Sequence, residues 1–345
     1  MYFASDNAGP VHPKALAALA AANSGFALPY GADAVTDQVR SQIRTLFEAP
    51  QAEVFLVATG TAANALALSC YCQPFETIFC SDVAHIHEDE CNAPEFYAGA
   101  AKLTLVPCGD KMTPAGLRRT IANENTRGVH GPQRGPVSIT QVTERGSVYS
   151  LAELRALTAV AADFNLPVHL DGARFANALV ALGCSAADMT WKSGVDVVSF
   201  GGTKNGLMGV EAVIFFDPGK AREFELRRKR GGHLFSKNRF LAAQMLAYLT
   251  DDLWIQSAQA ANASCAYLQQ GLVAKGAQFL HPVDANMIFA AFPRAAHQRL
   301  HQAGAMYYIW DGTLEGDDPD EMVAARMVCD WSVTRAQIDR FLSLI

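Results

Sequence analysis

A strand that ends in a glycine-rich turn constrains this chain of 345 residues more than any other feature. Residues 195–200 are mostly β-branched or aromatic, which is typical of a buried strand. Two glycines then break the strand, and Lys204 follows in a turn that ends at Gly206. Such a lysine is either an exposed loop residue or a Schiff-base lysine, whose amine bonds to the aldehyde of a cofactor. The second interpretation requires a phosphate site and a partner for the cofactor ring elsewhere in the sequence.

Strands and helices alternate along the first two thirds of the chain. Short apolar runs that indicate strands are separated by helical patterns, and this rhythm predicts a mostly parallel sheet with helices on both faces. The predicted fold class is therefore α/β, a three-layer αβα sandwich. We expect its strands at residues 54–58, 77–80, 102–106, 136–141, 166–170, 195–200 and 211–216.

Residues that cap helices mark several of the predicted helix starts. A serine or threonine followed three residues later by glutamate or glutamine forms a capping box, and proline is favoured in the first helical turn. The predicted starts are the Ser150–Glu153 box, Thr113–Pro114, Asp217–Pro218 and the Thr334–Gln337 box.

The last third of the chain predicts a smaller unit. Residues 236–271 are typical of long helices, and short strands are expected at 286–290, 307–310 and 326–329. We therefore expect a large domain over residues 1–250, with an N-terminal arm, and a small α+β domain over residues 251–345. A ligand-binding cleft is expected between the two domains.

Composition and charge disfavour several classes of function. The net charge of −6, with 28 Lys and Arg against 34 Asp and Glu, does not match a nucleic-acid-binding protein. The N-terminus has no secretory pattern, and no apolar run approaches the roughly 20 residues of a membrane span. Eight cysteines without metal-site spacing are typical of reduced thiols in a cytosolic protein. We therefore expect a cytoplasmic protein without a metal, nucleic-acid or membrane partner.

The strand predicted at residues 54–58 runs into a turn and an alanine-rich helix. Gly60 and Thr61 lie in this turn, where backbone N–H groups and the positive end of the helix suit a phosphate. The motif is neither a dinucleotide fingerprint nor a P-loop, because the further glycines and the Gly-Lys pair are absent. On its own, this segment fits an ordinary strand-to-helix turn better.

A second polar cluster follows the strand predicted at residues 166–170. Asp171 ends this strand, and Arg174 follows three residues later. A carboxylate at the carboxyl end of a strand points into the crevice where open α/β sheets bind ligands. Asp171 is thus suited to hold the protonated nitrogen of a pyridine cofactor, although aspartate also caps helix N-termini. Together with the turn at Gly60, this cluster favours the Schiff-base interpretation of Lys204.

The three segments around Gly60, Asp171 and Lys204 belong to a set of short motifs that is spread over almost the whole chain. They are Ser5-Asp6-Asn7, Tyr30-Gly31, Thr59–Asn64, Ala84-His85-Ile86, Asp89-Glu90-Cys91, Asp171–Arg174 and Phe200–Gly206. In combination they resemble the motifs of the low-specificity L-threonine aldolases. The resemblance implies a pyridoxal 5'-phosphate enzyme with the aspartate-aminotransferase fold, in the family of β-eliminating lyases and threonine aldolases.

The resemblance implies roles for the residues that would contact the cofactor. Lys204 would form the Schiff base with pyridoxal phosphate, Asp171 would pair with the pyridine nitrogen, and His85 would stack on the ring. Gly60 and Thr61 would hold the phosphate through backbone and hydroxyl groups.

The resemblance also implies a substrate site that is shared between subunits. Arg174 and Arg326 would face the carboxylate of an amino-acid substrate, with Ser5 nearby, and Arg174 would also contribute to the cofactor site. Lys229 would reach the phosphate of a neighbouring subunit, and Tyr30 would come from a partner chain. The implied assembly is a homo-oligomer, most often a tetramer built as a dimer of dimers.

The implied reaction is aldol cleavage of L-threonine, L-allo-threonine and other β-hydroxy-α-amino acids to glycine and an aldehyde. Removal of the β-hydroxyl proton breaks the Cα–Cβ bond while the cofactor ring takes up the charge. The base is left open among His85, His130, Glu90 and a phosphate-bound water.

Other functions compete with this interpretation. A β-eliminating lyase, or an aldolase for another substrate such as phenylserine, would use the same cofactor, and the sequence does not separate them. A β-eliminating lyase would release a keto acid and ammonia instead of glycine and an aldehyde. The missing glycine fingerprint disfavours a nucleotide-binding dehydrogenase. The joint presence of Lys204, Asp171 and Arg326 disfavours a cofactor-free scaffold protein.

Overall fold

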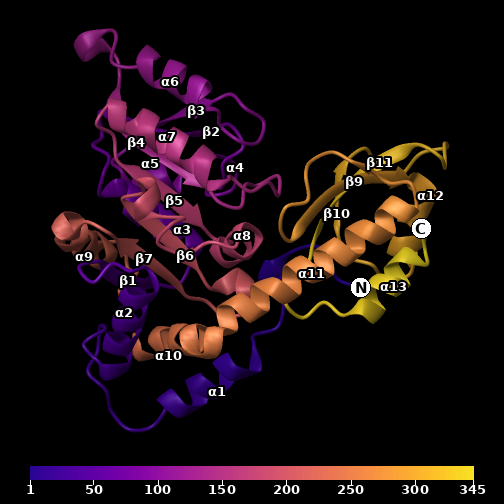
Figure 1. Cartoon of the computed structure of the whole chain (residues 1–345), viewed down its shortest axis with the longest axis horizontal. Coiled ribbons are helices and arrows are strands. Elements are labelled where there is room, and N and C mark those ends of the chain that lie inside the picture. Colours follow the sequence, from indigo (N-terminus) through magenta and orange to yellow (C-terminus); the bar gives the residue numbers. More distant parts are fainter.

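A large seven-stranded sheet forms the centre of the protein, whose computed structural model describes all residues from 1 to 345 (Figure 1). The strand order is β1-β7-β6-β5-β4-β2-β3. β7 runs antiparallel to both of its neighbours, and the other neighbouring pairs are parallel. The predicted mostly parallel sheet is therefore confirmed. The strands are β1 (Glu53–Val57), β2 (Glu76–Ser81), β3 (Lys102–Val106), β4 (Gln133–Thr140), β5 (Val168–Gly172), β6 (Val197–Gly201) and β7 (Glu211–Phe215).

Helices cover both faces of this sheet, as predicted for a three-layer αβα sandwich. On one face, apolar side chains of α3, α4 and α9 form two buried clusters with the sheet. On the other face, α2, α6, α7, α8 and α10 contribute to the largest core cluster. The helices named so far are α2 (Ala34–Leu46), α3 (Gly60–Ser69), α4 (His85–Glu88), α6 (Pro114–Asn123), α7 (Leu151–Asp163), α8 (Phe175–Leu182), α9 (Ala221–Arg230) and α10 (Arg239–Leu249).

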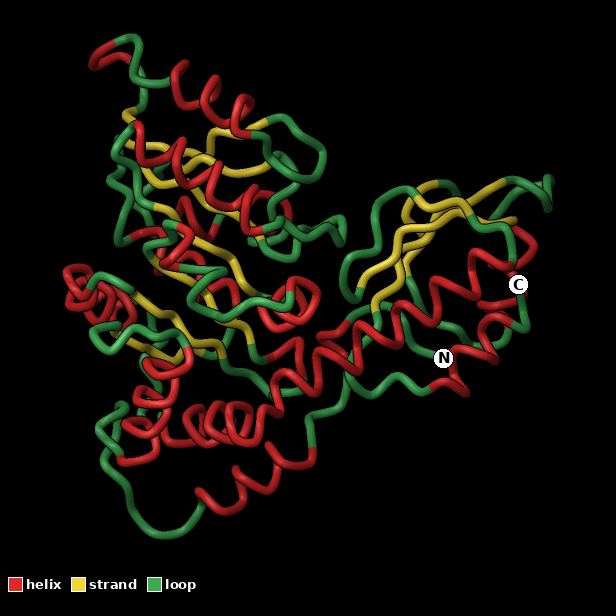
Figure 2. Tube along the Cα trace, viewed as in Figure 1, coloured by secondary structure: helices red, strands yellow, loops and turns green.

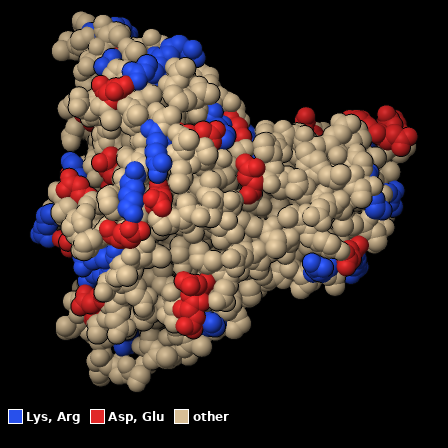
Figure 3. Space-filling view, viewed as in Figure 1, with Lys and Arg blue, Asp and Glu red and all other residues tan.

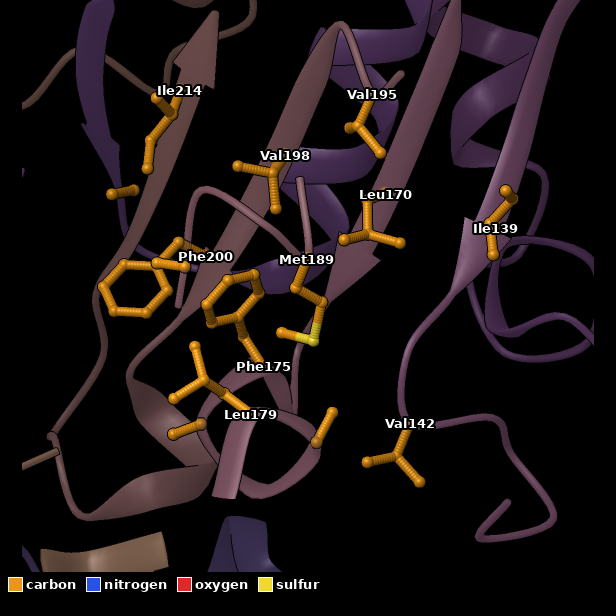
Figure 4. Close-up of a cluster of buried hydrophobic side chains, with 14 of the residues drawn as sticks. Ile139, Val142, Leu170, Phe175, Leu179, Met189, Val195, Val198, Phe200 and Ile214 are labelled. Atoms are coloured by element: carbon orange, nitrogen blue, oxygen red, sulfur yellow. The ribbon is translucent and has the colours of Figure 1, made fainter. Parts of the chain in front are cut away.

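The largest core cluster packs α8 against the middle strands. Figure 4 shows side chains of β5, β6 and β7 with Phe175 and Leu179 of α8 lying against them. Phe175 meets Phe200 edge-on, with ring centroids 5.3 Å apart. Alternation along β6 explains the two layers, because Val198 and Phe200 face this cluster while Val197 faces the cluster of α3.

Several predicted boundaries shift for a physical reason. β5 begins at Val168 instead of residue 166, because Pro167 lacks an N–H group for the ladder. The same strand continues through Asp171 and Gly172, which pair with residues of β6. Both predicted capping boxes are confirmed, at the starts of α7 and α13 (Arg335–Leu342), and Thr113 caps α6. Asp217 and Pro218 open a single 3-10 turn, and α9 begins after it.

The end of the chain forms a second, four-stranded antiparallel sheet with its own hydrophobic cluster. The strand order is β10-β11-β9-β8, with α11 and α13 packed against each other beside it (Figure 1). β8 was not expected from the sequence, and β11 begins four residues earlier than expected. The elements are α11 (Leu253–Ala274), β8 (Gln278–Phe279), β9 (Met287–Pro293), α12 (Arg294–Gln302), β10 (Tyr308–Asp311), β11 (Met322–Val328) and α13.

The N-terminal arm joins this small sheet to the large one. Phe3 is fully buried in the small-sheet cluster. Its backbone N–H donates a hydrogen bond to the carbonyl oxygen of Met306 at 2.7 Å, and its carbonyl oxygen accepts one from the N–H of Val328 at 2.8 Å. The chain then passes through α1 (Pro13–Ala22), which packs on α10 below the large sheet. The arm therefore brings residues 4–12 across the space between the two sheets.

The surface view shows how charges are distributed on one face. Basic and acidic side chains are interspersed over the large-sheet part, and acidic side chains gather at the far tip of the small-sheet part (Figure 3). No helix combines the length and the apolar character that a membrane span requires.

Candidate active site

A polar pocket of about 290 Å³ lies where the carboxyl edge of the large sheet meets the small sheet. Loops lie on the side of the large sheet that faces the small one (Figure 2). In open α/β sheets this edge is where ligands bind. The pocket is lined by Ser5, Asn7, His85, Glu88, Asp89, Glu144, Arg145, Arg174, Lys204, Tyr308, Trp310 and Arg326.

Lys204 reaches this pocket from the turn that follows β6. Its amine has no hydrogen-bond or ion-pair partner within the chain. Close packing explains the two glycines before it. A Cβ at Gly201 would clash with the carbonyl oxygen of Ala173, and a Cβ at Gly202 would lie 2.8 Å from the carbonyl oxygen of Val210. Gly206 ends the turn with a φ of +105°, which favours glycine. The turn therefore presents a free amine on a closely packed backbone.

Asp171 lies at the carboxyl end of β5, the central strand of the large sheet. Its carboxylate is almost fully buried and accepts two hydrogen bonds, from the backbone of Ala173 and from the side chain of Asn64, both at 3.0 Å. It does not cap α8, because Arg174 occupies the N-cap position of that helix. The helix-cap alternative is therefore wrong, and Asp171 is free for another role.

Asn64 connects Asp171 to a second carboxylate and to a histidine. Its amide nitrogen also donates to Glu90 at 2.9 Å, and Glu90 is 2.8 Å from Nδ1 of His85. Because Glu90 accepts both bonds, Nδ1 of His85 carries a proton and Nε2 has a free lone pair. Burial lowers the pKa of His85, but Glu90, Asp171 and Glu144 outweigh this effect and raise it above its ordinary value. Glu90 itself is buried behind His85 and does not line the pocket.

Arg174 is held by a buried ion pair with Asp6 of the N-terminal arm. Its Nε and Nη2 atoms donate to the two oxygens of Asp6 at 2.7 and 2.9 Å. Its third nitrogen lies 4.0 Å from Glu144. Burial raises the pKa of Asp6, but Arg174 and then Lys204 outweigh burial and lower it. The guanidinium of Arg174 is therefore already paired with a carboxylate of the same chain, which the sequence did not indicate.

Arg326 is the guanidinium group in this pocket that has no carboxylate partner. Its contacts are the carbonyl oxygen of Ala4 at 3.5 Å and the sulfur of Met287 at 3.6 Å, and no carboxylate is paired with it. Burial and the charge of Arg174 lower its pKa. Ser5, beside it in the pocket wall, accepts a hydrogen bond from the backbone of Asn7.

The start of α3 provides a second polar surface beside the pocket. Thr59 caps the helix through Ala62, so the N–H groups of Gly60 and Thr61 have no acceptor within the helix. The space around Gly60 is open, with no atom within 4 Å of an added Cβ. Asn64, one turn further along α3, contacts Asp171, and this contact places the start of the helix near the pocket.

Of the predicted site residues that do not line the pocket, three are exposed on the surface. His130 is exposed in a 3-10 turn just before β4, at the opposite edge of the sheet from Asp171. Tyr30 and Lys229 are also exposed, and the ammonium group of Lys229 lies 4.9 Å from the ring centre of Tyr30. These two residues therefore form a surface pair instead of part of this pocket.

Sequence reasoning missed several residues of the pocket. Glu144 follows β4 at the same sheet edge as Asp171, and this position was a usable signal. Burial raises its pKa, but the nearby charges of Lys204 and Arg174 outweigh burial and lower it. Tyr308 and Trp310 lie two residues apart on β10, and both line the pocket. Trp310 is also 4.7 Å from the guanidinium of Arg145, across the two sheets.

This arrangement combines four chemical functions in one place. It offers a free amine, a guanidinium for a carboxylate, an imidazole backed by a carboxylate, and an anion site at a helix start. A ligand with an aldehyde and a phosphate, bound beside an amino acid, matches these groups.

Comparisons with known proteins agree with this geometry. Residues 2–294 match the family model described as beta-eliminating lyase. A low specificity L-threonine aldolase from a Pseudomonas species is 41% identical over 97% of this chain and 94% of its own length. A solved threonine aldolase from Leishmania major superposes with a TM-score of 0.92 at 26% identity, covering 99% of this chain and 98% of its own. A serine palmitoyltransferase solved with pyridoxal phosphate shares the fold, with a TM-score of 0.72, 16% identity, and coverage of 100% and 86%.

The ion pair of Asp6 with Arg174 predicts a large stability effect. Asp6→Asn should lower the free energy of unfolding by about 3–5 kcal/mol, because it leaves a buried guanidinium without its counter-charge. Urea unfolding followed by circular dichroism measures this change. As a matched control, Asp37→Asn removes the exposed partner of Arg40 and should change the free energy by less than about 1 kcal/mol. Equal effects of the two substitutions would contradict the importance given to the buried pair.

Proposed function

The chain belongs to the beta-eliminating lyase family, and from this premise we propose that it is a threonine aldolase. It is a pyridoxal-phosphate-dependent carbon–carbon lyase that cleaves L-threonine, L-allo-threonine and other β-hydroxy-α-amino acids to glycine and an aldehyde. The observation that carries the proposal is the placement of Lys204, Arg326 and His85 around one pocket. The buried carboxylate of Asp171 is linked to His85 of this pocket through Asn64 and Glu90. The names of its relatives from Pseudomonas and Leishmania support the same activity.

The residues of the pocket fit pyridoxal phosphate. The unpartnered amine of Lys204 suits its aldehyde, and the buried carboxylate of Asp171 suits its ring nitrogen. The open space at Gly60, with the unpaired N–H groups of Gly60 and Thr61, suits its phosphate. When bound, the cofactor supplies an electron sink for the pair of electrons left on the substrate Cα.

The substrate carboxylate binds Arg326. A planar guanidinium donates two parallel hydrogen bonds to a carboxylate, and Arg326 has no competing anion within the chain. Arg174 contributes positive charge beside it while its own fork holds Asp6. The hydroxyl of Ser5 lines the same wall and completes the carboxylate site.

His85 accepts the proton of the substrate β-hydroxyl group at Nε2. Glu90, Asp171 and Glu144 outweigh burial, raise its pKa and so make the ring a stronger base, which suits proton abstraction. Glu90 orients the ring through Nδ1, and Glu144 adds negative charge that stabilises the protonated ring. As the proton leaves, the Cα–Cβ bond breaks and the aldehyde departs; a proton added at Cα then gives glycine. His130 would take part only if another subunit brought it to this edge of the sheet.

A second reaction deserves a direct comparison because the matching family is described as beta-eliminating lyase. β-Elimination would use the same cofactor and the same Arg326, and it would release a keto acid and ammonia. The aromatic side chains of Tyr308 and Trp310 in the pocket are compatible with larger substrates such as phenylserine. The threonine aldolase names of the similar proteins favour aldol cleavage over elimination.

We further propose a homotetramer, a dimer of dimers, in which Tyr30 and Lys229 complete the active site of a neighbouring subunit. Their contact with each other on the surface, away from their own pocket, supports this role. Large apolar side chains are also exposed in the segment between α1 and Tyr30, including Phe26 and Leu28. We also propose that residues 1–250 form the cofactor-binding domain and residues 251–345 the small domain.

A cytoplasmic location is supported by eight unpaired thiols, which suit a reducing compartment.

Analysis of the products tests the proposed reaction. Incubation of the holoenzyme with L-threonine should yield glycine and acetaldehyde in equal amounts, read by chromatography and a coupled aldehyde assay. Lys204→Ala should abolish aldehyde release while circular dichroism shows an intact fold, because the substitution removes the amine that binds the cofactor. A keto acid with ammonia would identify the elimination reaction instead, and turnover by Lys204→Ala would contradict the role of this lysine.

Mixing of inactive subunits tests the shared active site. Lys204→Ala and Lys229→Ala should each be inactive or nearly so, because each lacks one part of every site. When the two are unfolded together and refolded, mixed oligomers should regain a measurable fraction of the wild-type kcat, because some sites then receive both lysines. The matched control mixes Lys204→Ala with Asp171→Ala, which affect the same chain's side of the site. Recovery in the control, or none in the test, would contradict a site shared through Lys229.

A further inference from the structure

The backbone on both sides of Lys204 is held by buried side chains from other elements. The hydroxyl of Tyr248, on α10, donates to the carbonyl oxygen of Gly201 at 3.1 Å and accepts from the side chain of Asn205 at 2.6 Å. The side-chain oxygen of Gln244, on the same helix, accepts hydrogen bonds from the backbone N–H groups of Met208 and Gly209, at 2.9 and 3.2 Å. The turn is therefore fixed on both sides while the Lys204 amine is free.

Glu211 is the carboxyl group among the buried side chains that hydrogen-bond the backbone around Lys204. It begins β7 and lies opposite Gly201 in the ladder with β6. Its carboxyl group accepts a hydrogen bond from the backbone N–H of Gly202 at 2.6 Å, and the residue is 6% exposed.

A carboxyl group at this position has a cost that a neutral residue would avoid. Burial raises the pKa of Glu211 to about 7, although its hydrogen bonds and the charge of Lys204 act in the opposite direction. The ionisable groups that face it are Lys204, from the turn, and Tyr248, from α10. A glutamine would make the same bond to Gly202 without this desolvation cost. The charge of Glu211 therefore calls for a role, and Lys204 is the cation beside it.

We propose that Glu211 is a positioning residue for Lys204. Its carboxyl group fixes the backbone at Gly202, and thereby the direction in which Lys204 enters the pocket. Its negative charge also favours the charged form of the Lys204 nitrogen. The inference rests on the proposed function in one respect, because it takes Lys204 as the residue that binds the cofactor.

A pH titration of the holoenzyme tests the electrostatic part. The absorbance of the lysine-bound cofactor changes when the nitrogen of Lys204 loses its proton, and the midpoint of this change should be lower by about one pH unit in E211Q. E211Q keeps an oxygen acceptor for Gly202, so the turn should keep its shape. The matched control is E53Q, which removes a partly exposed glutamate at the start of β1, paired with Arg44 and outside the pocket. Its midpoint should equal that of the wild type.

A second variant tests the positioning part. E211A removes the hydrogen bond as well as the charge, and it should lower kcat by about 10- to 100-fold with little change in KM, because the amine is misplaced. E211Q should restore most of this loss. Circular dichroism and thermal unfolding establish that each variant is folded. If E211A does not fold, the comparison of E211Q with E53Q alone decides.

Equal midpoints in the wild type, E211Q and E53Q would overturn the proposal. If the wild-type protein showed no absorbance from a lysine-bound cofactor, the proposed function would be contradicted, and the titration would not test Glu211. In that case the rate at which acetic anhydride modifies Lys204 in the full chain, followed by peptide mass spectrometry at a series of pH values, still tests Glu211. The proposal then predicts the same downward shift of about one unit for Lys204 in E211Q. No shift in that assay overturns it independently of the cofactor.

Discussion

The buried amide of Asn64 is the contact on which the active site depends. One nitrogen donates to both Asp171 and Glu90, and Glu90 in turn holds His85. The amide thereby ties α3, the central strand and the segment after β2 into one rigid unit. The same helix presents its first-turn N–H groups next to Gly60. The groups that we assign to the ring nitrogen, the ring face and the phosphate are consequently fixed relative to one another by a single side chain.

Charge balance explains how so many ionised groups share a small pocket. Arg174 is neutralised by Asp6 within the chain, whereas Arg326 and Lys204 have no paired anion. The two unpaired cations match the two anionic partners that the proposed reaction brings, a substrate carboxylate and the cofactor. Burial raises the pKa of both Glu144 and Glu211, the charge of Lys204 lowers it, and neither carboxyl group forms a hydrogen bond to the Lys204 amine. The pocket is thus prepared for ligands instead of being closed by internal ion pairs.

Local patterns made much of the fold predictable from the sequence. The capping boxes at Ser150 and Thr334 and the strand before Lys204 depend on a few neighbouring residues, and the structure has them. Lys204 and Asp171 could be assigned to one sheet edge because parallel strands end there together. The pair of Asp6 with Arg174 and the bond of Asn64 to Asp171 join segments more than 100 residues apart, which no local pattern reports. For the same reason the sequence placed no role on Glu211, whereas the position of Glu144 after β4 would have indicated the sheet edge. His130 remained a candidate although this residue lies at the opposite edge.

The central claim is that the amine of Lys204 carries the cofactor. Borohydride reduction of the holoenzyme converts a lysine-bound cofactor into a stable secondary amine, and peptide mass spectrometry then locates it. Our account predicts the adduct on Lys204 and on no other lysine, including Lys229. An adduct on Lys229 or another lysine, or an unmodified Lys204 in protein saturated with pyridoxal phosphate, would contradict it.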